Sequence, residues 1–469
     1  MVIGREEGHT HRVRRSALRF GAVCAVVPLL LLAGPSSAPA SEPVIPPLGA
    51  SPVLAPLAIG DSTAPAPTPD GISAALSPVL AEGGWESSAT VVIDPADGSV
   101  LYDAGGSRAT APASTLKVLT ALAALTALGP DYRLRTRVMR AGSDIVLVGA
   151  GDSTLSRSKS TINGAPTGSL DELAATTARS LKRDKVTTVT LSFDDSLFTG
   201  PVLSPTWRPI LVEVGAVGPV TALMVDGGRE SPDSDTRVSD PSETAARYFA
   251  AQLRNFGIEV SESVQRSNTP AGAIEISRAL SPTIAEIVEY TLTESDNDVA
   301  EALAHLAGGR LGGAASFQGG ATATKRVLEG YGVPVDDLKL NDGSGLSRDD
   351  RAQPITIARA LQAMVTGVRP LGVEQAAPVG WAVLSGLPIA GFTGTLAERF
   401  DTKSTAVGRG VVRAKTGTLT GVSGLAGTVV DRDGRLLVFT VLTTGAETDN
   451  ARNALDRVAA TLAGCGCRG

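Results

Sequence analysis

Ser114-Thr115-Leu116-Lys117 opens a segment of strong helix formers that runs to Leu128 and is stopped by Gly129-Pro130. Leucine and alanine fill most of its positions, which indicates burial on several sides. The pattern predicts a mostly buried helix over 114–128 with Ser114 in its first turn. Residues three apart share a helix face, so we expect the Ser114 hydroxyl and the Lys117 amine to lie within hydrogen-bond range.

This serine and lysine suit acyl transfer without a catalytic histidine. A serine hydroxyl must lose its proton to a positioned base before it attacks a carbonyl carbon. Histidine is a poor candidate, because two of the three histidines lie in the first eleven residues and His305 lies within a predicted helix, where a packed side chain is expected. Lys117 can serve instead if burial and a second cation, Lys415, lower its pKa. Ser114 is the predicted nucleophile and Lys117 the predicted base.

Ser295-Asp296-Asn297 lies between predicted helices at 282–291 and 298–307. The Ser295 hydroxyl could relay a proton to the leaving group, and the Asn297 amide could hold the substrate and the lysine in place. The alternative is an ordinary helix N-cap, which these residue types also favour.

Lys415-Thr416-Gly417-Thr418 is expected to end a strand predicted over 411–415. A cation and two hydroxyls there could bind a substrate carboxylate, and Gly417 lets the backbone approach closely. The N–H groups of Thr418 and Ser114 could form an oxyanion hole. The alternative is a strand that ends in a Thr-Gly turn.

Ser156-Arg157-Ser158-Lys159 repeats the Ser-x-x-Lys spacing in a charged segment without apolar periodicity. Lys159 should stay solvated and protonated there. We therefore interpret Ser156 as a chance match.

Composition excludes several other classes of function. The chain has 469 residues, 43% of them hydrophobic, and a net charge of −6, which gives no basic surface for nucleic acid. The chain after the N-terminal segment keeps one histidine and no spaced Cys/His set, so we expect no metal and no cofactor. Cys465 and Cys467 at the C-terminus are expected to be free or paired with each other rather than catalytic.

The first forty residues resemble an export signal. Several arginines precede an apolar run over 20–33, and Ala38-Pro39-Ala40 offers a cleavage site. The run is shorter than a membrane-spanning helix requires, so a signal peptide over 1–40 is favoured and an uncleaved membrane anchor is the alternative. Residues 41–70 are rich in Pro, Ala and Ser and are expected to form a linker.

Strand patterns occur near both ends of the remaining chain, with helices between them. A short helix is predicted over 72–80 and a hairpin over 89–102. Strands are predicted over 422–430 and 435–442 before a closing helix at 450–462. They predict one discontinuous α/β (α+β) core, residues 71–133 and 277–469, with an antiparallel sheet flanked by helices. Residues 134–276 are expected to form an inserted α/β domain.

The three motifs in this order resemble the penicillin-recognising serine peptidases, and most closely the low-molecular-mass class C penicillin-binding proteins. Further stretches over 71–464 are similar to landmarks of that family: Gly149-Ala150-Gly151-Asp152, Asp342-Gly343-Ser344-Gly345-Leu346-Ser347-Arg348 and Gly394-Thr395-Leu396. The resemblance implies a β-lactamase/transpeptidase-like catalytic domain. Ala150 and Ser153 depart from the family pattern, and the insertion is shorter than in its fullest members, so a third domain could be missing or reduced.

The resemblance also implies a D-Ala-D-Ala carboxypeptidase or endopeptidase that acts outside the cytoplasm on peptidoglycan peptides and is acylated by β-lactams. Ser114, Lys117, Ser295 and Asn297 would be catalytic, and Lys415, Thr416, Gly417 and Thr418 would bind the substrate. One alternative is a β-lactamase, against which the absence of a Glu-x-x-Leu-Asn stretch before Ser295 counts. The other is a β-lactam or peptidoglycan sensor on the same fold.

Overall fold

The computed structural model describes residues 64–311, 313–368 and 379–468. The predicted signal peptide over 1–40 and most of the predicted linker lie outside these residues. Within them, no helix is long and apolar enough to cross a membrane.

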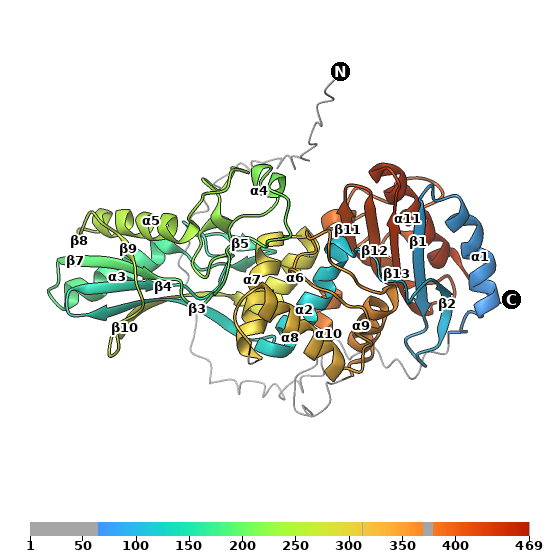
Figure 1. The fold of residues 1–469 in the computed structure, drawn as a ribbon, viewed down its shortest axis with the longest axis horizontal. Helices are drawn as coiled ribbons and strands as arrows, with labels where there is room; N and C mark the ends of the chain where they lie inside the picture. The colour runs from blue at the N-terminus through green and yellow to red at the C-terminus, as the bar shows by residue number, and fades with distance from the viewer. Residues whose placement is uncertain (1–63, 312, 369–378, 469) are drawn as a thin grey trace, which may run out of the picture. The chain divides into compact units, whose positions relative to one another are not determined.

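The first sheet joins strands from both ends of the chain in the order β11-β12-β13-β1-β2, and all neighbours in it are antiparallel (Figure 1). Its strands are β1 (Ser87–Ile93), β2 (Val100–Ala104), β11 (Val412–Leu419), β12 (Val422–Val430) and β13 (Leu436–Thr444). The predicted hairpin is confirmed as β1 and β2. The predicted fold class, a mixed α/β chain with an antiparallel sheet flanked by helices, is also confirmed.

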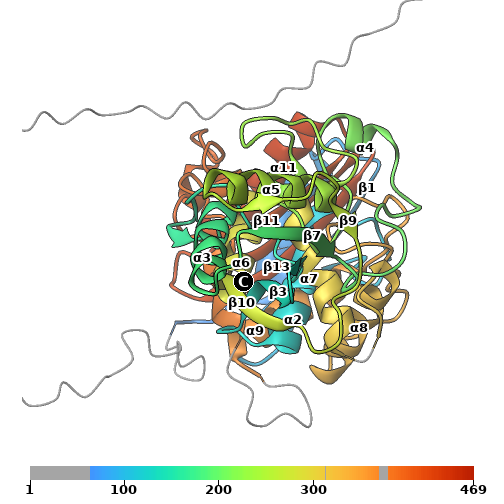
Figure 2. The same ribbon diagram turned by 90° about the vertical axis from the view of Figure 1, so that its left-hand side faces the viewer.

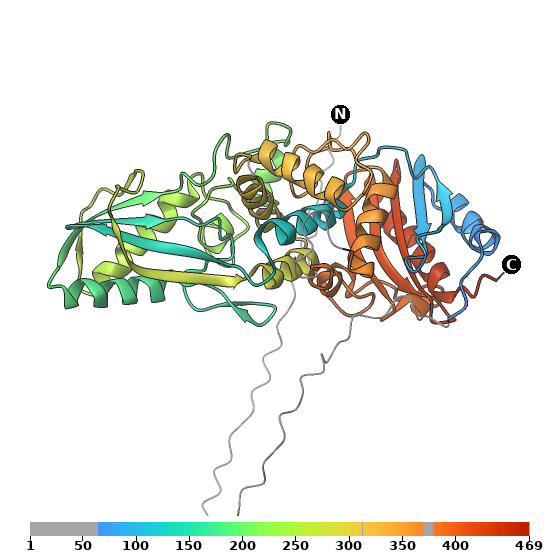
Figure 3. The ribbon, with the colours of Figure 1, turned by 90° about the horizontal axis from the view of Figure 1, so that it is seen from below.

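Both faces of this sheet are covered, because consecutive residues of β1, β12 and β13 are buried along most of each strand. Val92 points into one core with helices α1 (Pro69–Ala81) and α11 (Thr448–Gly464), whereas Val91 and Ile93 point into the core on the other face. Figure 3 shows the sheet between α1 on one side and α9 (Pro354–Thr366) on the other.

The larger core lies between the sheet and a layer of helices around α2 (Lys117–Leu128). The other helices of this layer are α6 (Ile284–Glu294), α7 (Asn297–Arg310), α8 (Phe317–Gly330) and α10 (Gly380–Gly386). Leu119, Leu122 and Leu125 are fully buried there, so α2 is enclosed on all sides and holds its first turn in a fixed position.

A second sheet is built from the middle of the chain in the order β10-β3-β4-β7-β8, with β9 also paired to β7. Its strands are β3 (Arg133–Ala141), β4 (Asp144–Val148), β7 (Thr188–Asp194), β8 (Glu259–Val260), β9 (Gln265–Arg266) and β10 (Ile274–Thr283). β4, β7, β8 and β9 pair in parallel, whereas β10, β3 and β4 pair antiparallel. Helices α3 (Leu170–Arg183) and α5 (Pro241–Asn255) pack on one face of it (Figure 2).

The remaining elements are short. They are α4 (Ile210–Glu213), the β5–β6 hairpin (Thr161–Ile162 and Ala165–Pro166) and the 3₁₀ turns Ala113–Leu116, Asp226–Gly228, Gly394–Leu396 and Ala406–Gly408. A disulfide joins Cys465 and Cys467 after α11.

Two local predictions differ from the structure. The helix expected over 72–80 begins earlier, at Pro69, because the Thr68 hydroxyl caps its N-terminus and proline suits the first helical position. The strand expected to end at Lys415 continues to Leu419, because β11 pairs with β12 along its whole length and the chain turns only at Gly421, whose φ is 70°. The Lys-Thr-Gly-Thr motif therefore lies within a strand and does not end it.

The predicted domain limits fall where the two sheets are connected. Residue 133 begins β3, and the limit between 276 and 277 falls within β10, which pairs with β3 along its length. We propose that residues 134–276 form a separate domain that is held to the helical layer by these two strands.

Candidate active site

Ser114 lies in the 3₁₀ turn Ala113–Leu116, directly before α2. The chain enters this turn through Ala113, which is buried and has a φ of 47°, a conformation that costs a residue with a Cβ on the order of 1 kcal/mol. Leu116 and the apolar face of α2 are fully buried and hold the turn in place. Ser114 itself is half-buried. The predicted helix is therefore present, but its first turn is 3₁₀ rather than α.

Lys117 is completely buried, and its Nζ makes three hydrogen bonds. The amine lies 2.9 Å from Ser114 Oγ, 2.7 Å from Asn297 Oδ1 and 2.8 Å from the carbonyl oxygen of Ser344. Three acceptors satisfy the three N–H bonds of an ammonium group. After deprotonation the nitrogen has a lone pair, and the Ser114 hydroxyl can then donate to it.

Burial lowers the pKa of Lys117 to about 8, against the favourable charges of Glu301, Asp342, Asp296 and Asp298. A lowering from 10.5 to about 8 means that the ammonium form is destabilised by about 3 kcal/mol relative to that of a solvated lysine. The geometry and the pKa both suit a base that takes the Ser114 proton near neutral pH.

The Ser-Asp-Asn motif links α6 to α7. Ser295 ends α6 with a φ of 61°, and the Asp296 carboxylate caps α7 by accepting from the Val299 N–H. The helix-cap interpretation is therefore correct for Asp296, but it leaves Asn297 free to bind Lys117. Within the described residues the Ser295 hydroxyl has no hydrogen-bond partner, so it remains available to a substrate.

Strand β11 lies directly against the turn that carries Ser114. A Cβ added at Gly417 would lie 2.8 Å from the carbonyl oxygen of Pro112, so a side chain there would push the strand away. On the same strand the Thr416 hydroxyl lies 2.8 Å from that of Thr395. Thr418, two residues further, is half-buried.

Lys415 is also completely buried, and its Nζ donates to the carbonyl oxygen of Thr416 at 3.1 Å. Burial first, and then the charge of Lys117, hold the pKa of Lys415 well below its usual range, while Glu294 opposes this. The charge effects show that Lys415 lies close to Lys117 and to Glu294, which directly precedes the Ser-Asp-Asn motif.

The expected contribution of Lys415 to the lowered pKa of Lys117 stays a prediction, because burial is the first cause of that shift. Lys117 has Glu301 and three aspartates near it, which favour its charged form, whereas Lys415 has only Glu294. The repulsion between the two lysines therefore lowers the pKa of Lys415, and burial accounts for the shift at Lys117.

The sequence assigned no role at the site to Ser344, which binds the Lys117 amine, or to Glu301, which holds the loop of Ser344. The loop 342–348 brings the Ser344 carbonyl to the amine, and Glu301 on α7 holds that loop by accepting from the N–H groups of Gly343 and Ser344 at 2.9 and 2.8 Å. Burial, followed by the charge of Asp342, raises the pKa of Glu301 to about 8. The glycines of the loop were a signal of close packing: Gly345 has a φ of 82°, and a Cβ there would overlap the carbonyl oxygen of Ala113.

The middle of the chain also contributes to the site. Asn297 Nδ2 donates to the carbonyl oxygen of Ala216 at 2.8 Å, and Asp298 accepts from the Gly218 N–H at 2.7 Å. Arg237 pairs with Asp298 at 2.7 Å, and both side chains are 3% exposed. The segment 215–218 is thus fixed beside Lys117 by a buried ion pair.

The two residues judged unsuitable from the sequence have structural roles. Lys159 is paired with Glu172, whereas the Ser156 hydroxyl bonds Ser158, Thr167 and Gly168. The buried His305 ring packs against two phenylalanines, and burial lowers its pKa to about 4.

The described residues contain no group of three or more His, Cys, Asp or Glu side chains placed to hold a metal ion. The expectation of a chain without metal or cofactor stays a prediction.

The model of the D-Ala-D-Ala carboxypeptidase 3 (S13) family matches residues 72–236 and 231–464. The chain belongs to this family. It is 34% identical to the carboxypeptidase DacB of Mycolicibacterium smegmatis over 444 residues, which cover 92% of this chain and 91% of that protein. It is 29% identical to a D-alanyl-D-alanine carboxypeptidase of Actinomadura over 485 residues, covering 85% and 84% of the two chains. This S13 chain is a serine-type D-Ala-D-Ala carboxypeptidase, which confirms the activity and the family expected from the motifs.

Among solved structures, the S13 chain resembles penicillin binding protein 4 (dacB) from Haemophilus influenzae with a TM-score of 0.66. The match covers 84% of this chain and 98% of that one at 22% identity, and it supports the fold.

Proposed function

We propose that Ser114 is the nucleophile of this carboxypeptidase and Lys117 its base, and that they act on peptides ending in D-Ala-D-Ala. The single observation that carries this assignment is the 2.9 Å contact between Ser114 Oγ and a lysine amine that is fully buried. A solvated lysine would be protonated at neutral pH and could not accept the serine proton. The burial of Lys117 removes that obstacle.

In the acylation step, Ser114 Oγ attacks the carbonyl carbon of the penultimate residue as its proton passes to Lys117 Nζ. The C–N bond to the terminal D-Ala then breaks, and the proton moves to the departing amine. Ser295 is suited to relay it, because its hydroxyl is free and it is two residues from Asn297, which contacts the same lysine. Water then hydrolyses the ester and releases the shortened peptide.

The carboxylate of the terminal D-Ala would bind at Lys415, Thr416 and Thr418 along β11. The low pKa of Lys415 in the empty cleft comes from burial and from repulsion by Lys117. A bound carboxylate opposes both effects and favours protonation of Lys415, so a charged pair would form when the substrate arrives. Gly417 keeps the strand close to Ser114, so that the N–H groups of Thr418 and Ser114 can stabilise the oxyanion.

β-Lactams would acylate the same serine. The similar fold of penicillin binding protein 4 from Haemophilus influenzae, which has also been solved in complex with a β-lactam, supports this part of the proposal. Action on peptidoglycan places the working enzyme outside the cytoplasm, and the export-like N-terminal sequence agrees with that location. Membrane association through the N-terminus has no support within the described residues.

Labelling by fluorescent penicillin tests the assignment of the serine. The Ser114→Ala variant should lose covalent labelling, whereas Ser156→Ala, which removes the other Ser-x-x-Lys serine, should retain it. Labelling that persists in Ser114→Ala would overturn the site.

Release of D-alanine from a pentapeptide, compared with cleavage of a cross-linked dimer, then separates carboxypeptidase from endopeptidase turnover. We expect D-alanine release by the native protein. Labelling without either cleavage would mean that this chain works as a β-lactam or peptidoglycan sensor.

A further inference from the structure

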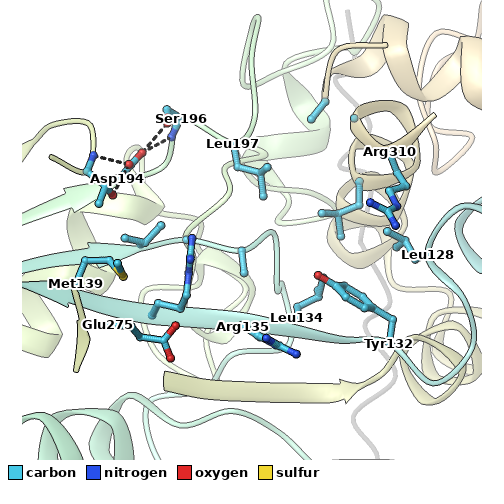
Figure 4. A pocket seen from close by; sticks show the side chains of 18 of the residues that line it. Leu128, Tyr132, Leu134, Arg135, Met139, Asp194, Ser196, Leu197, Glu275 and Arg310 are labelled. Carbon is cyan, nitrogen blue, oxygen red and sulfur yellow. Dashed lines mark hydrogen bonds between the residues drawn. The ribbon is translucent and has the colours of Figure 1, made fainter. Parts of the chain in front are cut away.

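A second hollow, separate from the catalytic cleft, lies between the uncovered face of the second sheet and the C-terminal ends of α2 and α7 (Figure 4). Its volume is about 970 Å³, and β3 and α7 supply seven of its nineteen lining residues. Volumes up to about 1,000 Å³ are usual for sites that enclose a small organic ligand.

Three arginines line this hollow. None of their side chains has a hydrogen-bond or ion-pair partner among residues 64–311, 313–368 and 379–468. They are Arg135 and Arg137 on β3 and Arg310 in the last turn of α7. Arg135 and Arg137 alternate with buried residues of β3, so both point to the face of the sheet opposite to α3 and α5. Three unpaired guanidinium groups around one hollow form an unusual concentration of positive charge in a chain with a net charge of −6.

Two carboxylates also line the hollow, but neither is paired with these arginines, and the three guanidinium groups outnumber them. The Asp194 carboxylate accepts hydrogen bonds from the backbone and hydroxyl groups of Ser196 and Thr269 (Figure 4). Glu275 is paired with Arg278 on its own strand. The hollow therefore favours an anion.

The rest of the lining is largely apolar. Tyr132 and Leu197 are 47% and 45% exposed there, and Met139 and Leu306 also face the hollow. An apolar surface with guanidinium groups beside it suits a ligand that carries both methyl groups and carboxylates.

This hollow is remote from the nucleophile. Ser114 and Asn297 lie at the N-terminal ends of α2 and α7, whereas Leu128 and Arg310 lie at their C-terminal ends. At 1.5 Å per residue these helices separate the two sites by roughly 15–20 Å.

We propose that this arginine-lined hollow is a non-catalytic binding site for a second peptidoglycan stem peptide, held by its carboxylates. The proposal rests on the proposed function, since the substrate class is taken from it. Peptidoglycan presents many stem peptides close together, each with alanine methyl groups and a free carboxylate. Occupation of the hollow by one stem would hold the polymer on the enzyme while a neighbouring stem enters the catalytic cleft.

The test is a calorimetric titration of the full chain after acylation by penicillin, which blocks the catalytic cleft. The probe is an N-acetylated peptide ending in D-Ala-D-Ala, and its C-terminal amide is the control ligand. We expect saturable binding of one acid-form peptide and at least tenfold weaker binding of the amide. The variant with Arg135→Gln, Arg137→Gln and Arg310→Gln should bind the acid form at least tenfold more weakly.

A matched variant removes three positive charges from the other side of the same sheet: Arg179→Gln, Lys182→Gln and Lys185→Gln, all exposed on or just after α3. It should bind the peptide as the native chain does. Thermal unfolding checks that both triple variants are folded, and Arg310→Gln alone replaces the first if it is not.

Absence of saturable binding to the acylated chain, equal binding of acid and amide, or equal weakening by both triple variants would overturn the proposal. Tighter binding of a glycerol-phosphate polymer than of the peptide would also overturn it, in favour of a phosphate ligand. If penicillin does not label the chain, the proposed function fails, and the same titration with Ser114→Ala still tests the hollow.

Discussion

The rate of acylation by penicillin should rise with pH and level off near pH 8, because it requires the neutral amine of Lys117. With a pKa of about 8, the neutral fraction of Lys117 is about 1% at pH 6, about 9% at pH 7 and half at pH 8. The second-order acylation rate should therefore increase about 50-fold between pH 6 and pH 8 and less than about twofold above pH 8. An ordinary lysine with a pKa of 10.5 would give a rate that still rises tenfold per unit at pH 9.

Glu301 provides a matched perturbation of the same profile. Glu301, whose own pKa is about 8, raises the pKa of Lys117 where it is ionised, so Glu301→Gln should move the midpoint of the pH–rate profile below that of the native enzyme. The two oxygens of Glu301 accept from the N–H groups of Gly343 and Ser344 separately, and the variant keeps one of these two bonds. Stopped-flow or quenched labelling over pH 5.5–10 measures both profiles. A flat native profile, a rate still rising at pH 10, or a midpoint that moves upward in Glu301→Gln would refute this explanation of the base.

Three further substitutions follow from the packing of the site. Asn297→Ala removes a hydrogen-bond acceptor from Lys117. A hydrogen bond to a charged group contributes about 1.5–3 kcal/mol, so the variant should be acylated by penicillin about tenfold to hundredfold more slowly. An unchanged acylation rate would contradict the contact. Gly417→Ala should reduce the free energy of unfolding by about 1–3 kcal/mol in urea titrations. Gly464→Ala is the control and should not reduce it, because the added Cβ would meet only atoms 3.8 Å or more away. Equal effects of the two substitutions would count against close packing of β11. Arg237→Met leaves the Asp298 carboxylate buried without its cation and should reduce the free energy of unfolding by about 3–5 kcal/mol. A reduction below about 1 kcal/mol would exclude a buried ion pair.

The fold was predictable from sequence where local pattern determines structure. The apolar run after Ser114 and the strand patterns near both ends each indicated their element. The occurrence of strands near both ends, with helices between them, indicated that the ends of the chain meet in one sheet. Limits of elements were less accurate. The strand through Lys415 was ended too early because Thr416-Gly417 looks like a turn, whereas pairing with β12 extends it.

The site was predictable as a set of motifs but not as an electrostatic environment. Lys117 contacts both Ser114 and Asn297 as expected. Which lysine loses its proton more readily depends on Glu301, Asp342 and Glu294, and their positions follow from tertiary packing. The spacing between these acids and the lysines along the sequence does not show which of them become neighbours in the fold.

The central claim is that Ser114 carries the acyl group and that buried Lys117 activates it. Mass spectrometry of a tryptic digest after brief exposure to penicillin tests this claim most directly, with Lys117→Ala as the comparison. We expect the penicilloyl adduct in the peptide 109–117, on Ser114, in the native protein, and no adduct in the Lys117→Ala variant over the same exposure. An adduct on any other residue, or equal acylation of Ser114 without Lys117, would contradict it.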